Sequence, residues 1–184
     1  MASRITRSQS NRAPLGWCGM VDLYLRCAAN KFAVTVTDYV ILFFATVRKV
    51  AFSASLLATG EGNTESRPSY TTLIFKNVFT NIGNHYNPNT GLFSAPVRGV
   101  YYFTFTGHAA LSENYNMMRL VKNNEAITLS ADFPPSWSDP GDNSSNGVVL
   151  QLEVGDVVFV QLLGMVWDDQ NHRTSFSGFL LFPL

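Results

Sequence analysis

Residues 75–105 of the 184-residue chain read FKNVFTNIGNHYNPNTGLFSAPVRGVYYFTF. Short runs rich in aromatic and β-branched residues alternate in this stretch with clusters of Asn, Gly and Pro. Runs of the first kind pack well on a pleated sheet, and clusters of the second kind form the turns between strands. In the final run, Tyr101, Phe103 and Phe105 alternate with Thr104, as expected for a strand with one buried and one solvated face. The stretch therefore predicts an all-β domain.

The same pattern continues on both sides of this stretch, from residue 50 to residue 182. The predicted strands are 50–57, 70–79, 92–94, 99–107, 117–122, 126–129, 148–154, 157–164 and 175–182. Gly155 and Asp156 predict a tight hairpin between two of them. No apolar stripe repeats with the period of a helix, so no helix is expected. The polar segment 132–146 predicts a long loop, and long loops in compact domains are often functional.

The charges divide the chain into two parts near residue 49. Residues 1–49 carry seven Lys/Arg and two Asp/Glu, a balance of +5, whereas residues 50–184 carry six and eleven, a balance of −5. We therefore expect a basic amino-terminal arm (1–49) and a separate domain (50–184). The larger part lacks the basic surface that nucleic-acid binding requires, which argues against that class of partner. Both cysteines, Cys18 and Cys27, lie in the arm, so the domain has no disulfide framework or thiolate metal site.

The arm contains an apolar run, FAVTVTDYVILFFATV at residues 32–47, which is interrupted by Asp38. Its charge-free part, residues 39–47, is nine residues long. A membrane-spanning helix needs about 20 apolar residues, so the run is nearer the length of a signal-peptide core. Three interpretations stay open: an altered export signal, a weak membrane anchor, or a segment that does not belong to the natural chain start.

The last predicted strand has two apolar faces. One face carries Phe176, Gly178, Leu180 and Phe182, and the other carries Phe179 and Leu181. Each sheet of a two-layer sandwich has only one dry face, so the second apolar face needs another cover. The strand 157–164 shows a similar pattern. A partner subunit is the simplest cover, with predicted interface residues Phe179, Leu181, Val158 and Val160; cover from within the same subunit is the alternative.

Residues 75–105 resemble the signature of the C1q-domain family. The matching positions are Phe75, Asn81, Tyr86, Phe93, Gly99, Tyr101, Phe103 and Phe105. Further similar blocks follow the family order: VAFSASLL at 50–57, SNGVVLQLEVGD at 145–156, and SFSGFLLF at 175–182, which includes Gly178 and Phe179. The resemblance covers essentially all of residues 50–184 and is closest to short complement C1q-like and cerebellin-like proteins.

This resemblance implies a ten-stranded jelly-roll β-sandwich, the fold shared with the tumour-necrosis-factor group, assembled as a homotrimer. The aromatic motif residues would fill the sandwich. The resemblance also implies a secreted, extracellular protein that recognises protein, glycan or lipid ligands in innate immunity or extracellular signalling. The alternative is a membrane-tethered, cytokine-like ligand of the tumour-necrosis-factor type, anchored by residues 32–47. No Gly-X-Y repeats occur, so this chain carries no collagen stalk.

The sequence contains no catalytic motif of the kinds tested: no HExxH, no GxSxG and no phosphate-binding loop. We therefore expect a protein that is not an enzyme and holds no cofactor. Some members of the family bind calcium near the trimer apex, which makes Asp139 and Asp142 candidate calcium ligands, although ordinary solvated loop acids explain them equally well. The sequon that begins at Asn143 predicts N-glycosylation and a glycoprotein.

Overall fold

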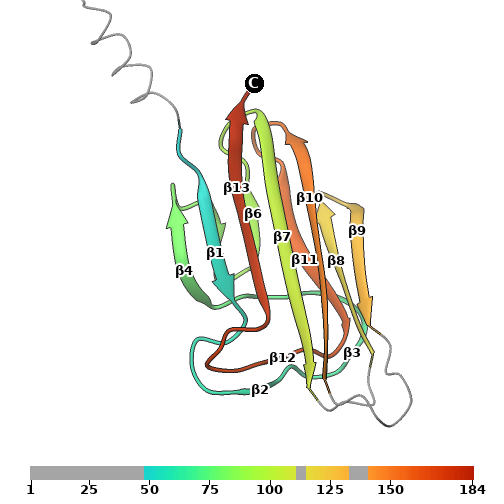
Figure 1. The fold of residues 1–184 in the computed structure, drawn as a ribbon. Helices are drawn as coiled ribbons and strands as arrows, with labels where there is room; N and C mark the ends of the chain where they lie inside the picture. The colour runs from blue at the N-terminus through green and yellow to red at the C-terminus, as the bar shows by residue number, and fades with distance from the viewer. Residues whose placement is uncertain (1–47, 111–114, 133–140) are drawn as a thin grey trace, which may run out of the picture. The chain divides into compact units, whose positions relative to one another are not determined.

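Figure 1 shows the computed structural model, which describes residues 48–110, 115–132 and 141–184. The regular structure in these ranges consists of strands. They are β1 (Ala51–Ser55), β2 (Gly62–Asn63), β3 (Arg67–Thr72), β4 (Asn77–Ile82), β5 (Tyr86–Asn87), β6 (Leu92–Ser94), β7 (Gly99–Ala110), β8 (Asn116–Lys122), β9 (Glu125–Asp132), β10 (Gly141–Leu152), β11 (Val157–Gly164), β12 (Trp167–Asp168) and β13 (Ser175–Pro183). Three of these, β2, β5 and β12, are only two residues long, which leaves ten longer strands in the described ranges.

The strands form two antiparallel sheets packed face to face. The seven-stranded sheet has the order β2-β12-β7-β13-β1-β4, with β10 also paired to β7. The six-stranded sheet has the order β5-β6-β11-β8-β9, with β3 also paired to β11. The first and last long strands, β1 and β13, lie side by side in the middle of the larger sheet. The predicted all-β jelly-roll sandwich is confirmed.

Two predicted segments differ from the structure in an informative way. The predicted strand 70–79 is divided into β3 and β4, because the chain crosses between sheets there. The Leu73 N–H donates to the Val160 carbonyl in the smaller sheet, and the Lys76 N–H donates to the Leu56 carbonyl beside the larger one. The predicted loop 132–146 is also shorter than expected, since β9 runs to Asp132 and β10 begins at Gly141.

The core between the sheets is aromatic. Phe52 stacks on Tyr86 with ring centroids 4.7 Å apart, and Phe176 meets Phe52 edge-on at 4.9 Å. Stacked and edge-on pairs of this kind add stability beyond the burial of their area. The aromatic motif residues all lie here, each no more than 2% exposed: Phe75, Tyr86, Phe93, Tyr101, Phe103 and Phe105.

Gly178 lies on the inward face of β13, where a side chain would not fit. A Cβ atom at this position would lie 2.4 Å from the Phe103 ring and 2.8 Å from the Phe52 ring. The absence of a side chain therefore lets two aromatic rings reach the backbone of β13.

Asn81 and Tyr86 hold together the turn between β4 and β5. The Asn81 amide nitrogen donates to the Tyr86 carbonyl at 2.8 Å, and the Tyr86 N–H donates to the Asn81 oxygen at 3.2 Å. The buried Tyr86 hydroxyl donates to the Phe75 carbonyl at 2.9 Å and accepts from the Phe75 N–H at 3.2 Å. Burial raises the pKa of Tyr86 to about 12, although its bond to the Phe75 backbone acts in the opposite direction.

The described head, residues 48–184 with the gaps given above, has its first and last long strands next to one another. The Leu180 N–H donates to the Val50 carbonyl at 3.0 Å, and the Leu184 N–H donates to the Arg98 carbonyl at the same distance. No helix in the described ranges is long and apolar enough to cross a membrane. The apolar run 32–47 lies outside these ranges.

Candidate binding surface

One apolar row crosses the outer face of the seven-stranded sheet. Ile82 pairs with Ala51, Ala51 with Phe179, Phe179 with Tyr102, and Tyr102 with Val149, so the row spans β4, β1, β13, β7 and β10. Ile82 is 51% exposed, Phe179 42% and Val149 56%. The Tyr102 and Phe179 rings contact each other with centroids 5.6 Å apart. An apolar row of this kind on an outer face is a candidate interaction surface.

The rest of this outer face is polar. The neighbouring row consists of Thr80, Ser53, Ser177, Thr104 and Gly147. Within it, the hydroxyls of Ser53 and Ser177 lie 2.8 Å apart in a hydrogen bond. The apolar surface is thus confined to the end of the sheet where β1 begins and β13 ends.

The predicted interface residues fall into two groups. Phe179 and Leu181 point to solvent, with Leu181 46% exposed. Phe179 was also assigned to the core motif, and its exposure shows that it does not belong to the core. Val158 and Val160 are fully buried between the sheets, so neither side chain can reach a partner. Their prediction as interface residues is corrected: the alternation of β11 identified two faces, and its even-numbered face points inward.

A second exposed apolar site, not singled out in the sequence, lies where the edges of the two sheets meet. Leu129 on β9 is 45% exposed there, beside Asn146 of β10. The Asn146 side chain bridges these strands, because its Nδ2 donates to the Thr128 hydroxyl at 2.7 Å and to the Leu129 carbonyl at 3.0 Å. The chain therefore has an apolar face and an apolar edge.

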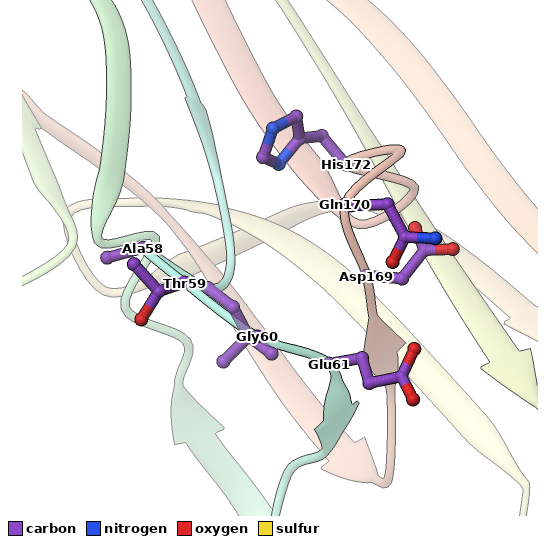
Figure 2. A pocket seen from close by; sticks show the side chains of 8 residues that line it. Ala58, Thr59, Gly60, Glu61, Asp169, Gln170 and His172 are labelled. Atoms are coloured by element: carbon purple, nitrogen blue, oxygen red, sulfur yellow. The ribbon is translucent and has the colours of Figure 1, made fainter.

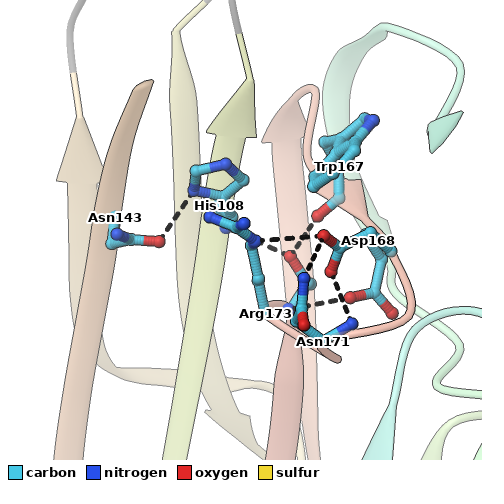
Figure 3. Close-up of polar contacts among 8 residues, drawn as sticks. His108, Asn143, Trp167, Asp168, Asn171 and Arg173 are labelled. Atoms are coloured by element: carbon cyan, nitrogen blue, oxygen red, sulfur yellow. Dashed lines mark hydrogen bonds and ion pairs between the residues drawn. The ribbon is translucent and has the colours of Figure 1, made fainter. Parts of the chain in front are cut away.

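Asn143 lies in a strand rather than in the predicted loop. It pairs with His108 across β10 and β7, and its Oδ1 accepts a hydrogen bond of 2.8 Å from the His108 Nδ1 (Figure 3). The Asn143 side chain is exposed, and its Nδ2, the atom that carries an N-linked glycan, makes no hydrogen bond within the described part of the chain. N-glycosylation of Asn143 stays a prediction.

The candidate calcium ligands lie largely beyond what the structure describes. Asp139 is outside the described residues, and of Asp142 only the backbone is described, paired with Ala109. Among the described residues, no group of three or more His, Cys, Asp or Glu side chains is placed to hold a metal ion. Calcium binding therefore stays a prediction.

The segment that links β12 to β13 is fixed by two buried aspartates (Figure 3). Asp168 accepts the Leu57 N–H at 3.0 Å and the Thr174 N–H at 3.2 Å. Asp169 accepts the Asn171 N–H at 2.8 Å and forms an ion pair of 3.3 Å with Arg173. Burial acts to raise the pKa of Asp169, but the hydrogen bonds from Asn171 and the charge of Arg173 outweigh it and lower the pKa overall.

A cleft of about 480 Å³ opens beside this segment (Figure 2). One wall is residues 57–61, and the other is formed by Asp169, Gln170 and His172. The two walls are more than one hundred positions apart in the sequence, so no sequence pattern could have placed them together.

A two-sheet jelly roll with an apolar outer face and a surface cleft defines a binding module. The chain belongs to the C1q-domain family: the family model described as "C1q domain" matches residues 51–181. Proteins of this family act in recognition and signalling rather than in catalysis.

Particular relatives agree with this placement. Complement C1q tumor necrosis factor-related protein 3 from Homo sapiens is 39% identical over 137 residues, which cover 73% of this chain and 52% of that protein. The chain thus spans about half the length of the curated relatives that it matches. A solved structure of the globular domain of zebrafish complement 1qA aligns with a TM-score of 0.56 at 24% identity, covering 74% of this chain and 99% of that one.

The fold is also shared with a tumour-necrosis-factor protein. The structure of Eiger TNF from S. frugiperda aligns with a TM-score of 0.58 at 13% identity, covering 74% of this chain and 95% of that one. Similarity at this identity shows the fold alone. It does not favour the membrane-tethered, cytokine-like alternative, whose anchor at 32–47 lies outside the described residues.

Proposed function

We propose that the chain is a secreted, C1q-like recognition protein that works as a homotrimer. The observation that supports this most directly is the apolar row through Phe179 on the outer face of the larger sheet. Three copies arranged in a closed ring contact one another through two different surfaces of each chain. The face around Phe179 and the edge around Leu129 are two such surfaces, both apolar and both exposed.

A trimer would turn weak single contacts into strong binding. Three identical heads offer the same loops in a fixed arrangement, and avidity can exceed single-site affinity by roughly a hundredfold or more. The ligands that we propose are extracellular proteins, glycans or lipid head groups, bound in innate-immune recognition or extracellular signalling. The similarity to complement C1q proteins supports this assignment.

Light scattering of the full chain at micromolar concentration tests the assembly. We expect the mass of three chains for the wild type. Phe179→Glu should yield monomers, because it places a charge in the middle of the apolar row. Val154→Glu is the matched control, since Val154 is a 69% exposed apolar residue in the turn after β10. A monomeric wild type, or equal effects of the two variants, would contradict the proposal.

A further inference from the structure

The cleft between residues 57–61 and the β12–β13 segment has one rigid wall. In that wall the His172 N–H donates to the Asp169 carbonyl at 3.0 Å, which closes a tight turn. His172 has a φ of 56 degrees, in the left-handed region. A residue with a Cβ is strained in this conformation, so the surrounding contacts must hold it in place.

The His172 side chain is also fixed. Its Nδ1 lies 3.0 Å from the hydroxyl of the buried Ser55, which accepts a further hydrogen bond of 3.0 Å from the Asn77 amide. The Phe79 ring meets the imidazole edge-on with centroids 5.0 Å apart, and Phe79 is 52% exposed. An exposed aromatic ring therefore lies directly beside the residue that forms the rigid wall.

The opposite wall is open. It is anchored where the Leu57 N–H bonds to Asp168, but residues 58–61 make no further hydrogen bond within the described ranges. Figure 2 shows Ala58, Thr59 and Gly60 across from His172 and Gln170. Their backbone carbonyls are therefore available to a ligand as hydrogen-bond acceptors.

The charges at the cleft favour a cationic ligand. Glu61 is exposed and forms no ion pair with any described residue, whereas the carboxylate of Asp169 is already engaged by Asn171 and Arg173. The Gln170 amide oxygen and the free carbonyls add neutral acceptors. The domain from residue 50 onward has a balance of −5, so the wider field also attracts positive charge.

We propose that this cleft is a docking site for a partner protein that presents a lysine side chain next to an apolar one. The ammonium group enters between Glu61, Gln170 and the carbonyls of residues 58–60. The apolar neighbour rests on Phe79, because aromatic side chains are the usual anchors of protein interfaces. The inference goes beyond the proposed recognition role by naming the class of partner, and it does not depend on trimer formation.

The probe for this proposal is N-acetyl-lysyl-leucine amide, and its control is the uncharged isostere N-acetyl-norleucyl-leucine amide. In two-dimensional NMR spectra of the full, ¹⁵N-labelled chain, millimolar lysyl peptide should shift the amide signals of residues 57–61 and 170–172. The norleucyl peptide should shift them far less, and added salt should weaken the effect of the lysyl peptide.

Two variants with a matched control identify the groups involved. Glu61→Gln should weaken binding of the lysyl peptide about threefold, as expected for one exposed ion pair. Glu65→Gln changes a nearby exposed glutamate outside the cleft and should leave binding unchanged. His172→Asn keeps a residue that tolerates a left-handed φ while it removes the ring beside Phe79, and it should also weaken binding.

Three outcomes would overturn the docking site: equal shifts with both peptides, no shifts in residues 57–61 and 170–172, or equal loss from Glu61→Gln and Glu65→Gln. Light scattering of the same samples reports assembly independently. A trimer without peptide binding refutes the docking site alone, and a monomer that binds the lysyl peptide refutes the trimer alone.

Discussion

The side chain of Asn146 connects the two sheets through Thr128, with its Nδ2 donating to the threonine hydroxyl at 2.7 Å. The same nitrogen reaches the Leu129 carbonyl at 3.0 Å, and the Asn146 Oδ1 accepts the N–H of Gly147 at 2.8 Å. β10 belongs to one sheet and β9 to the other, and the two strands do not pair. The Asn146 carboxamide therefore supplies hydrogen bonds to both strand edges.

Replacing Asn146 with Ala should lower the free energy of unfolding by about 1–2 kcal/mol, because it removes these hydrogen bonds. Urea denaturation of the two proteins measures the difference. Asn124→Ala is the control, since Asn124 is an exposed asparagine in the neighbouring hairpin without a hydrogen bond in the described structure. Equal stability of the two variants would show that Asn146 does not hold the edges together.

Replacing Gly178 with Ala should destabilise the fold by about 1–3 kcal/mol, because the new methyl group collides with the Phe103 ring. The double variant Gly178→Ala/Phe103→Leu replaces that ring with a smaller side chain. Its loss of stability should be smaller than the sum of the losses of the two single variants. Thermal unfolding of all four proteins gives the coupling energy. Strict additivity would mean that another neighbour sets the cost.

The stability of the fold should fall between pH 10 and pH 12 through Tyr86. The folded-state pKa of about 12 lies above the usual tyrosine pKa of 10.0, so the stabilisation is complete below pH 10 and is lost as the pH rises through 12. The loss amounts to roughly 2–3 kcal/mol. Denaturant unfolding across this pH range should show a shallower decline for Tyr86→Phe than for the wild type.

The same Tyr86→Phe variant should already be less stable at neutral pH, by about 1–3 kcal/mol, because the buried Phe75 backbone groups lose their partner. Tyr101→Phe is an informative comparison: its hydroxyl donates to the Val97 carbonyl alone. A Tyr101→Phe variant that loses more stability than Tyr86→Phe would contradict this account.

Expression of the chain through a secretory pathway should attach a glycan at Asn143. The linkage forms at Nδ2 and leaves Oδ1 free to accept from His108 Nδ1. Treatment with an amidase that removes N-linked glycans should then lower the intact mass. Ser145→Ala breaks the sequon without touching Asn143, so it should abolish the mass change; an unchanged wild-type mass would remove the glycan prediction.

The sequence predicted the fold wherever alternation carried the information. The spacing of Tyr101, Phe103 and Phe105 identified the buried face of β7, and the structure buries all three. Alternation cannot reveal where an irregularity shifts the register of a strand, however. A register shift between Leu180 and Phe182 turns Phe182 outward, where it is 51% exposed, although its spacing from Phe176 predicted the opposite face.

The sequence was less informative about the surface. The pattern around Val158 showed two apolar faces but not which one points inward, because that depends on the opposing sheet. The polar segment near Asn143 looked like a loop, yet it forms the start of β10 because β7 extends to Ala110 and pairs with it. The cleft lies between Glu61, in the segment that follows β1, and His172, in the segment that precedes β13. Only the folded chain brings these two segments together.

The bond between Leu180 and Val50 has a consequence for how the head is displayed. The chain enters β1 and leaves β13 at one pole, while Leu57 and the rest of the cleft lie beyond the other end of β1. Any tether joined before residue 48 or after residue 184 would therefore hold the head by the pole opposite the cleft. Attached to a surface or to another module in this way, the head would direct the cleft outward, toward whatever approaches.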